Sequence, residues 1–198
     1  MNLEQSIQDM FDEHIELAQT AARNSRYVIE KAARLLAQCL IVGGKILSCG
    51  NGGSASDSLH FTAEIANRFR TERDGLAAVS LSADVSLLTA IGNDYGFQYL
   101  FSRQIKALGN KGDTLLAIST SGNSENMVQA VHMAHECNMR VIYLSGNYGG
   151  KMRGVLTEND IDICIESNVT SHIQEMHILV IHCLCDLIDK ILIAEGYL

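Results

Sequence analysis

From residue 45 onward, short apolar runs alternate with segments in which apolar residues recur every three or four positions. A continuous apolar run is typical of a buried strand, whereas the longer repeat is typical of a helix with one buried face. The pattern predicts strands over 45–49, 77–81, 113–118, 139–144 and 160–165, and helices over 54–70, 84–91, 97–108, 123–137 and 171–194. Strands separated by helices favour a parallel sheet covered on both faces, which is an α/β fold.

Residues 1–42 precede this alternation and carry apolar residues at helical spacing. We expect two helices here, over 1–20 and about 25–42, with a break at Asn24–Ser25. No linker, repeat or low-complexity tract interrupts the 198 residues. The sequence therefore predicts a single domain over 1–198, with residues 1–42 as an N-terminal helical extension.

The last predicted helix has apolar residues on almost every side. Such a helix is buried all round, and the edge of one sheet covers only one of its faces. We therefore expect the other faces, including Ile188, to contact partner subunits. The alternative is a central helix within a monomer.

The stretch from Leu115 to Ser124 runs from an apolar strand into Ser-Thr-Ser-Gly-Asn-Ser, after which helical periodicity resumes. The main-chain N–H groups of such a loop and the helix dipole favour an anion, and the hydroxyls add neutral donors. Neither Lys nor Arg occurs between Leu115 and Gln129, which favours a sugar phosphate over a nucleoside triphosphate. The alternative interpretation is a Ser/Thr-rich helix N-cap.

A second strand ends in Gly50-Asn51-Gly52-Gly53-Ser54, again before a predicted helix. The loop matches neither the GxGxxG dinucleotide fingerprint nor the P-loop. Two such loops in one small α/β domain nevertheless point to a ligand, because ligands in these sheets bind outside the carboxyl ends of the strands.

Several polar residues on the helices are candidates for chemistry. His60 and Glu64 are four residues apart and share a helix face, so they could hold a metal ion or act as an acid/base pair; a surface interaction is the alternative. Gln174, His177 and His182 interrupt the apolar final helix, and helical geometry leaves open which histidine joins Gln174. Asn93–Asp94 could contact a ligand or form a turn.

Composition narrows the class of protein. The formal net charge of −8 argues against a broad nucleic-acid or anionic-membrane surface. The chain shows no signal-peptide pattern and no apolar run of membrane-spanning length, so we expect a cytoplasmic protein with neither nucleic-acid nor membrane partners. Its six cysteines form no CxxC pair, which argues against a zinc ribbon or a thioredoxin-type site.

Taken together, these residues resemble the phosphoheptose (sedoheptulose 7-phosphate) isomerases of the SIS (sugar isomerase) superfamily over nearly the whole chain. The matching segments are Gly43–Ser54, His60-Phe61 with Glu64, Gly92-Asn93-Asp94, Ala117–Ser124, Gly149–Met152, and Ile173–His177 with His182. The resemblance implies a three-layer α/β/α sandwich with a five-stranded parallel sheet. It also implies a homotetramer with active sites between subunits.

The resemblance further implies one zinc ion per subunit, bound by His60, Glu64, Gln174 and His182, and so selects His182 over His177. Glu64 would be the base and His182 the acid. The implied substrate contacts are Asn51, Gly52, Gly53, Ser54, Glu64, Asn93, Asp94, Ser119, Thr120, Ser121, Ser124 and Gln174. Whether the metal is catalytic or organises the site stays open, and His172 and Ser171 depart from the residues usual in relatives.

The implied reaction converts D-sedoheptulose 7-phosphate to D-glycero-D-manno-heptose 7-phosphate, the first step towards the heptose of lipopolysaccharide core. The alternative is a non-catalytic SIS-domain protein that binds a phosphosugar or the bacterial replication initiator. The presence of Glu64 together with His60, Gln174 and His182 favours the enzyme.

Overall fold

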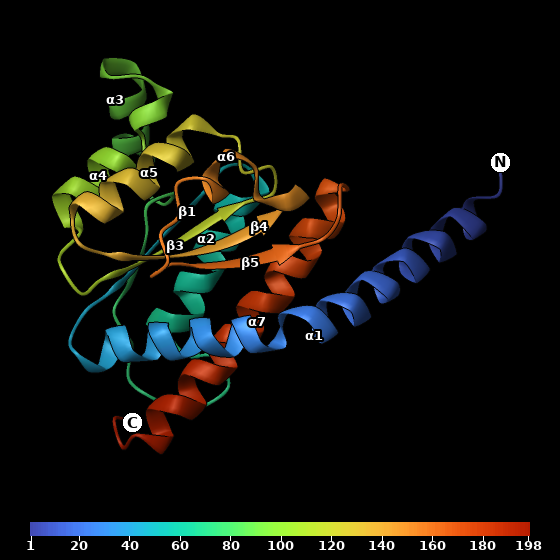
Figure 1. Ribbon diagram of the computed structural model, residues 1–198, viewed down its shortest axis with the longest axis horizontal. Helices are drawn as coiled ribbons and strands as arrows, with labels where there is room; N and C mark the ends of the chain where they lie inside the picture. Colours follow the sequence, from blue (N-terminus) through green and yellow to red (C-terminus); the bar gives the residue numbers. More distant parts are fainter.

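The computed structural model describes residues 1–198 as three layers, with helices on both faces of a parallel five-stranded sheet (Figure 1). This confirms the predicted α/β/α sandwich. The strands are β1 (Ile46–Gly50), β2 (Ala78–Ser80), β3 (Thr114–Ser119), β4 (Arg140–Gly146) and β5 (Ile161–Ile165). All five coincide with predicted strands to within two residues at either end.

The strand order is β2-β1-β3-β4-β5, with every neighbouring pair parallel. From β1 the chain continues to one side of the sheet as β2 and then returns to the other side as β3. β1 and β3 therefore flank the point at which the order of strands reverses, where ligands bind in such sheets. The register pairs Gly50 with Ile118, so the loops that follow these two strands begin side by side.

Two apolar cores lie on opposite faces of the sheet. Leu116 and Ile118 of β3 point into the core beneath α1 (Leu3–Ile41), α2 (Gly53–Ala66) and α7 (Thr170–Ala194). Leu115 and Ala117 point into the core beneath α4 (Ser102–Leu108) and α5 (Glu125–Glu136). Because successive strand residues face opposite ways, a strand covered on both faces is apolar throughout.

The remaining helical segments are short or peripheral: α3 (Val85–Asp94), α6 (Gly150–Arg153), and the 3-10 turns η1 (Phe97–Tyr99) and η2 (Asn147–Gly149). The helix predicted over 97–108 is in fact divided into η1 and α4. α3 continues three residues beyond its predicted end, so that Asn93 and Asp94 lie in its last turn. α6 was not predicted from the sequence.

The N-terminal region is one continuous helix of 39 residues, so the predicted break at Asn24–Ser25 is wrong. Residues 3–41 contain neither glycine nor proline, and asparagine and serine lower helix propensity by only about 0.5 kcal/mol each. Burial of Ser25 against the rest of the chain (5 % exposed) keeps the helix continuous. Its first half projects from the sandwich (Figure 1).

α7 packs against both α1 and α2, so this chain itself covers much of its apolar surface. Ile188 is fully buried in the core, and the expectation that it faces a partner subunit is wrong. Leu179 and Ile193 stay 44 % and 47 % exposed. None of the helices combines the length and the apolar character needed to cross a membrane.

Candidate active site

A reciprocal amide pair joins the loop after β1 to the first turn of α5, which follows the loop after β3. Asn51 Nδ2 donates to Asn126 Oδ1 at 2.9 Å, and Asn126 Nδ2 donates to Asn51 Oδ1 at 2.8 Å. Gly52 begins α2 with φ of +56°, a backbone conformation that favours glycine. The predicted glycine loop is therefore hydrogen-bonded to the first turn of α5, the helix that follows the predicted phosphate loop.

Main-chain and hydroxyl contacts hold the phosphate-type loop from Ser119 to Ser124. Ser119 Oγ accepts from Gly122 N–H at 3.2 Å, and Tyr143 Oη donates to the Ser119 carbonyl at 3.2 Å. Gly122 has φ of +64°, and a Cβ atom there would collide with the Gly149 carbonyl. The loop consequently has a fixed shape at the N-terminus of α5.

Ser124 is the N-cap residue of α5, yet its side chain makes no capping hydrogen bond. The first main-chain N–H groups of a helix lack intrahelical partners. The Ser124 hydroxyl and the N-terminus of α5 are thus open to an anion. This geometry favours anion binding over the N-cap alternative.

α2 and α7 bring three of the four proposed metal ligands together. His60 Nε2 lies 3.2 Å from Glu64 Oε1 and 3.1 Å from His182 Nε2. The ring of Phe69 stacks on His182 with centroids 5.5 Å apart. The side chains of His60 and Glu64 are 42 % and 26 % exposed, so solutes can reach them.

Gln174 lies near the N-terminus of α7, about 12 Å along the helix axis from His182. Its amide lies against Gly53 at the start of α2, where a Cβ atom on Gly53 would collide with it. α7 thus contacts α2 at two places, through Gln174 at Gly53 and through His182 at His60. Gln174 makes no hydrogen bond to His60, Glu64 or His182 in this arrangement.

The donor set is of the type that zinc prefers, with two imidazole nitrogens, a carboxylate and an amide oxygen. As they stand, the side chains do not surround a common point closely enough to form a metal centre. Ligands of tetrahedral zinc lie about 3.3 Å from one another at bond lengths near 2.0 Å. The two separations measured from His60 Nε2 match that value, so His60, Glu64 and His182 fit zinc after side-chain rotation, whereas the Gln174 amide lies against Gly53.

The fold places the two candidate histidines, His177 and His182, in different surroundings. His177 is fully buried and its Nε2 lies 3.0 Å from the Ser145 carbonyl oxygen. Burial lowers the pKa of His177 to about 4, although the bond to Ser145 opposes this shift. His177 is therefore a neutral core residue, whereas His182 lies beside His60.

Asp57 is a further polar residue on this face of α2, and sequence reasoning missed it. It lies one turn before His60, and its Oδ2 is buried without a hydrogen-bond partner. Burial raises the pKa of Asp57 to about 6, while the nearby His60 acts in the opposite direction. Its signal in the sequence was the seven-residue spacing from Glu64, which places both on one helix face.

Other predicted residues lie less close to this centre. Asn93 donates to Asp94 at 2.8 Å, and both are exposed on α3, which stands apart from α2 and α7 (Figure 1). Ser54 is 3 % exposed in the first turn of α2, so its hydroxyl offers little surface to a ligand. Thr120 and Ser121 are half-buried in the phosphate-type loop.

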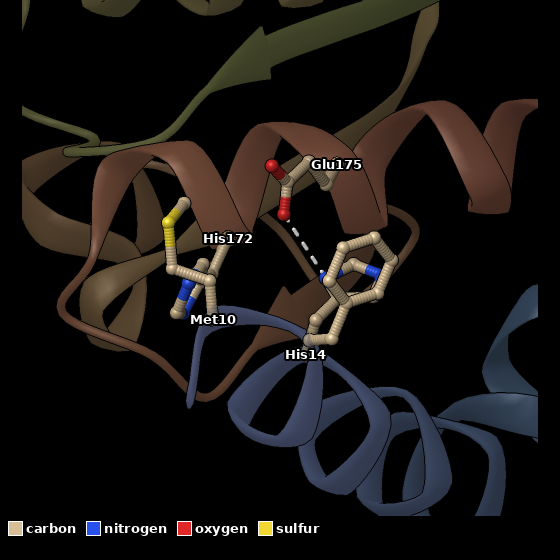
Figure 2. Close-up of a pocket in the computed structure, with 5 residues that line it drawn as sticks. Met10, His14, His172 and Glu175 are labelled. Atoms are coloured by element: carbon tan, nitrogen blue, oxygen red, sulfur yellow. Dashed lines mark ion pairs between the residues drawn. The ribbon is translucent and has the colours of Figure 1, made fainter. Parts of the chain in front are cut away.

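A separate cavity lies between α1 and α7 and contains none of the predicted site residues (Figure 2). Here His14 Nδ1 lies 3.0 Å from Glu175 Oε2, which ties the two helices together. His172 lines the same cavity, 3.9 Å from Glu13. His172, which departs from the residue usual in relatives, thus lies where α7 faces α1.

Residues 10–146 match the sequence model of the SIS domain. The chain belongs to the SIS-domain family. It is 51 % identical to the phosphoheptose isomerase of Methylibium petroleiphilum, over 98 % of this chain and 96 % of that protein. The isomerase assignment extends to the whole length of the chain, beyond the matched domain.

Two solved structures agree with this assignment. The phosphoheptose isomerase GmhA of Neisseria gonorrhoeae is 48 % identical with a TM-score of 0.91, and a phosphoheptose isomerase of Francisella tularensis is 42 % identical with a TM-score of 0.93. Each comparison covers 96 % of this chain and all of the other. The chain is thus an enzyme of the phosphoheptose isomerases, and a sugar phosphate is its class of substrate.

Proposed function

We propose that this protein converts D-sedoheptulose 7-phosphate to D-glycero-D-manno-heptopyranose 7-phosphate by ketose–aldose isomerisation. The observation that carries the proposal is the position of the Glu64 carboxylate. It lies beside His60 on the helix that follows one strand-end loop, and that loop is hydrogen-bonded to the first turn of α5, directly after the lysine-free phosphate-type loop. A base and a phosphate site are thereby joined in one rigid unit.

The phosphate group would bind the loop after β3, through hydroxyls and the N-terminus of α5. The residues proposed for substrate binding are Asn51, Gly52, Gly53, Ser54, Glu64, Asn93, Asp94, Ser119, Thr120, Ser121, Ser124 and Gln174. Support comes from the uncommitted Ser124 hydroxyl and from the exposed glycines at the start of α2. Holding the phosphate at one end orients the sugar carbonyl towards α2 and α7.

The isomerisation moves one proton between two neighbouring carbons. Glu64 removes a proton from C1 of the ketose while the C2 carbonyl oxygen receives a proton from His182, which gives an enediol. Glu64 then returns a proton to C2 while His182, now deprotonated, takes the proton of the C1 hydroxyl, which gives the aldose and restores both side chains. His60 lies between the two side chains, 3.2 Å from one and 3.1 Å from the other, and orients both.

His60, Glu64, Gln174 and His182 would hold one zinc ion per subunit. When bound, the ion would supply Lewis-acid stabilisation of a developing oxyanion. A carboxylate fully engaged with metal is a poor proton carrier, so an organising role for the ion is the alternative to a catalytic one. Metal titration against activity distinguishes the two roles.

We propose a homotetramer, supported by apolar surface that one chain leaves uncovered. The exposed apolar residues of the projecting half of α1 share one face of that helix: Leu3, Ile7, Met10, Phe11 and Ile15. Asn93 and Asp94 would act at a site completed by another subunit. The cytoplasmic location and the place of the reaction at the start of heptose synthesis for lipopolysaccharide core stay predictions.

A non-catalytic protein that binds a phosphosugar or the replication initiator would keep the fold and the phosphate-type loop. Such a protein would not need a carboxylate beside two histidines, because it catalyses no proton transfer. The arrangement of Glu64, His60 and His182 therefore favours catalysis.

One assay separates these functions. Purified protein is incubated with sedoheptulose 7-phosphate, and the aldose is measured before chelation, after chelation and after zinc is restored. We expect turnover that falls on chelation and returns with zinc. Binding of the sugar phosphate without any aldose from the zinc-loaded protein would contradict the enzyme and support the binding module.

A further inference from the structure

Arg73 lies in the segment between α2 and β2, and its side chain is only 2 % exposed. Its Nε donates to Asp189 Oδ1 of α7 at 2.7 Å, and the Asp189 side chain is 3 % exposed. A buried guanidinium is tolerated only when its donors are satisfied and its charge is paired. The acceptors of its other N–H groups therefore show which part of the structure Arg73 holds in place.

Those donors go mainly to the C-terminal end of α2, with one further contact from Nη1 to the neighbouring Asp74 carbonyl at 3.0 Å. Nη2 donates to the main-chain carbonyl of Glu64 at 3.0 Å, and Nη1 donates to those of Ile65 and Asn67 at 2.9 and 3.2 Å. The last carbonyls of a helix lack partners within the helix. The guanidinium thus caps α2 at the turn that carries Glu64.

Asp189 follows His182 by two turns of α7 and lies on nearly the same helix face. One side chain therefore joins the backbone of Glu64 to the helix that carries His182. We propose that Arg73 is a positioning residue for Glu64: it fixes the last turn of α2 against α7 and so sets the place of the Glu64 carboxylate relative to His182. The role rests on the isomerase reaction proposed above.

Lysine cannot replace this arrangement. Its ammonium group is a single point with three donors, whereas Arg73 spreads its bonds over three nitrogens in a planar fork. Arg73→Lys keeps the charge but releases part of the cap. A displacement of about 1 Å in a reacting group lowers turnover by about 100-fold, so we expect kcat to fall between about 10- and 100-fold.

The experiment must separate positioning from loss of folded protein. Reactions run in D2O report how often the proton removed from C1 is returned to C2 and how often solvent deuterium replaces it. This ratio belongs to each turnover, so it does not depend on how much enzyme is folded. It is measured together with KM and with kcat per folded molecule, the folded fraction being taken from circular dichroism.

The variants are Arg73→Lys and Asp189→Asn, the second being the milder change because its amide oxygen still accepts from Arg73. The matched control is Asp113→Asn, which weakens another cation–carboxylate pair, the partly buried Lys45–Asp113 at the amino ends of the strands. We expect both test variants to incorporate more deuterium and to lose kcat with KM little changed. The control is expected to lose stability but to keep the wild-type deuterium ratio and kcat.

An active wild type with unchanged kcat and deuterium ratio in both test variants would overturn the positioning role alone. The same deuterium shift in Asp113→Asn would also overturn it, because general destabilisation would then explain the effect. If Arg73→Lys does not fold, Asp189→Asn decides the matter by the same criteria. A wild-type protein that forms no aldose would contradict the proposed function and, with it, the role of Arg73.

Discussion

Two carboxylates at opposite ends of the parallel strands have different surroundings. At the amino ends of the strands, Asp113 accepts from Lys45 N–H at 2.9 Å, from Lys45 Nζ at 2.5 Å and from Asn110 N–H at 2.8 Å. Near the carboxyl ends, one oxygen of Asp57 is buried without any partner, and burial raises the pKa of Asp57 to about 6. Both side chains belong to one chain and one fold.

The contrast concerns what surrounds each carboxylate. Both oxygens of Asp113 are hydrogen-bonded, as buried polar atoms almost always are, whereas the unpaired oxygen of Asp57 belongs to the face of α2 that carries Glu64. Perturbed carboxylates also gather at functional sites. Asp57, the uncapped N-terminus of α5 and the exposed apolar residues of the projecting half of α1 are accordingly the places where substitutions should change function rather than stability.

The largest expected effect comes from replacing one carboxylate at each end of the strands by the corresponding amide. Glu64→Gln should lower kcat by about 10²–10⁴-fold with little change in stability, because an amide cannot act as a base. Asp113→Asn should lower the free energy of unfolding by on the order of 2 kcal/mol and leave kcat intact. Steady-state kinetics and urea unfolding on both variants measure the contrast. A Glu64→Gln enzyme with most of the wild-type rate would remove the base assignment.

The second test concerns apolar surface that the chain does not cover. Phe11 is 65 % exposed on the projecting half of α1, so Phe11→Asp removes nothing from the core. We expect it to weaken assembly at least tenfold and to lower activity in parallel, because an unpaired charge is costly in a buried interface.

Gln5→Asp, on the polar face of the same helix, is the control for that charge and should leave assembly unchanged. Light scattering and turnover on the same samples provide the comparison. A fully active monomer would show that assembly and activity are independent.

The third test concerns His177, a core residue that has one ring nitrogen hydrogen-bonded and the other without a partner. His177 Nδ1 is buried without a partner, and burial lowers the pKa of the ring from 6.5 to about 4. Between these values the unfolded chain binds a proton that the folded chain does not, so His177 makes stability fall as the pH decreases from 6.5 to 4. The loss amounts to about 3 kcal/mol at most.

His177→Gln keeps a donor for the Ser145 carbonyl but does not titrate. Its free energy of unfolding should therefore fall less over this pH range than that of the wild type. Asp57 contributes with the opposite sign, since its raised pKa favours the folded state as the pH falls through 6. The difference between the two proteins isolates His177, and parallel pH curves would contradict its assignment as a buried neutral group.

The smallest expected effect concerns Ser124, whose side chain does not cap α5. If its hydroxyl binds phosphate, Ser124→Ala should raise KM about tenfold, which corresponds to a hydrogen bond to a charged group. Stability should stay unchanged, and inorganic phosphate should inhibit the variant less well. A loss of about 1 kcal/mol in stability with normal KM would instead restore the N-cap interpretation.

The order of strands and helices could be predicted from the sequence because a strand that is buried on both faces is a continuous run of apolar residues. Continuous apolar runs such as Leu115–Ile118 occur where helices cover both sides of a strand. The two loops were predictable for the same reason, since each follows such a run directly. The helix break at Asn24–Ser25 was predicted wrongly because tertiary packing of Ser25 overrides a small local preference.

The sequence by itself thus determined the layers, the two strand-end loops and the pairing of His60 with Glu64, all of which depend on residues close together in the chain. Only the tertiary structure decided that His182 rather than His177 meets His60, that Asn126 pairs with Asn51, and that Arg73 joins α2 to α7. Each of these contacts links residues that lie far apart in sequence. The rotation and packing of α7 bring such residues together, and helical spacing alone leaves that rotation undetermined.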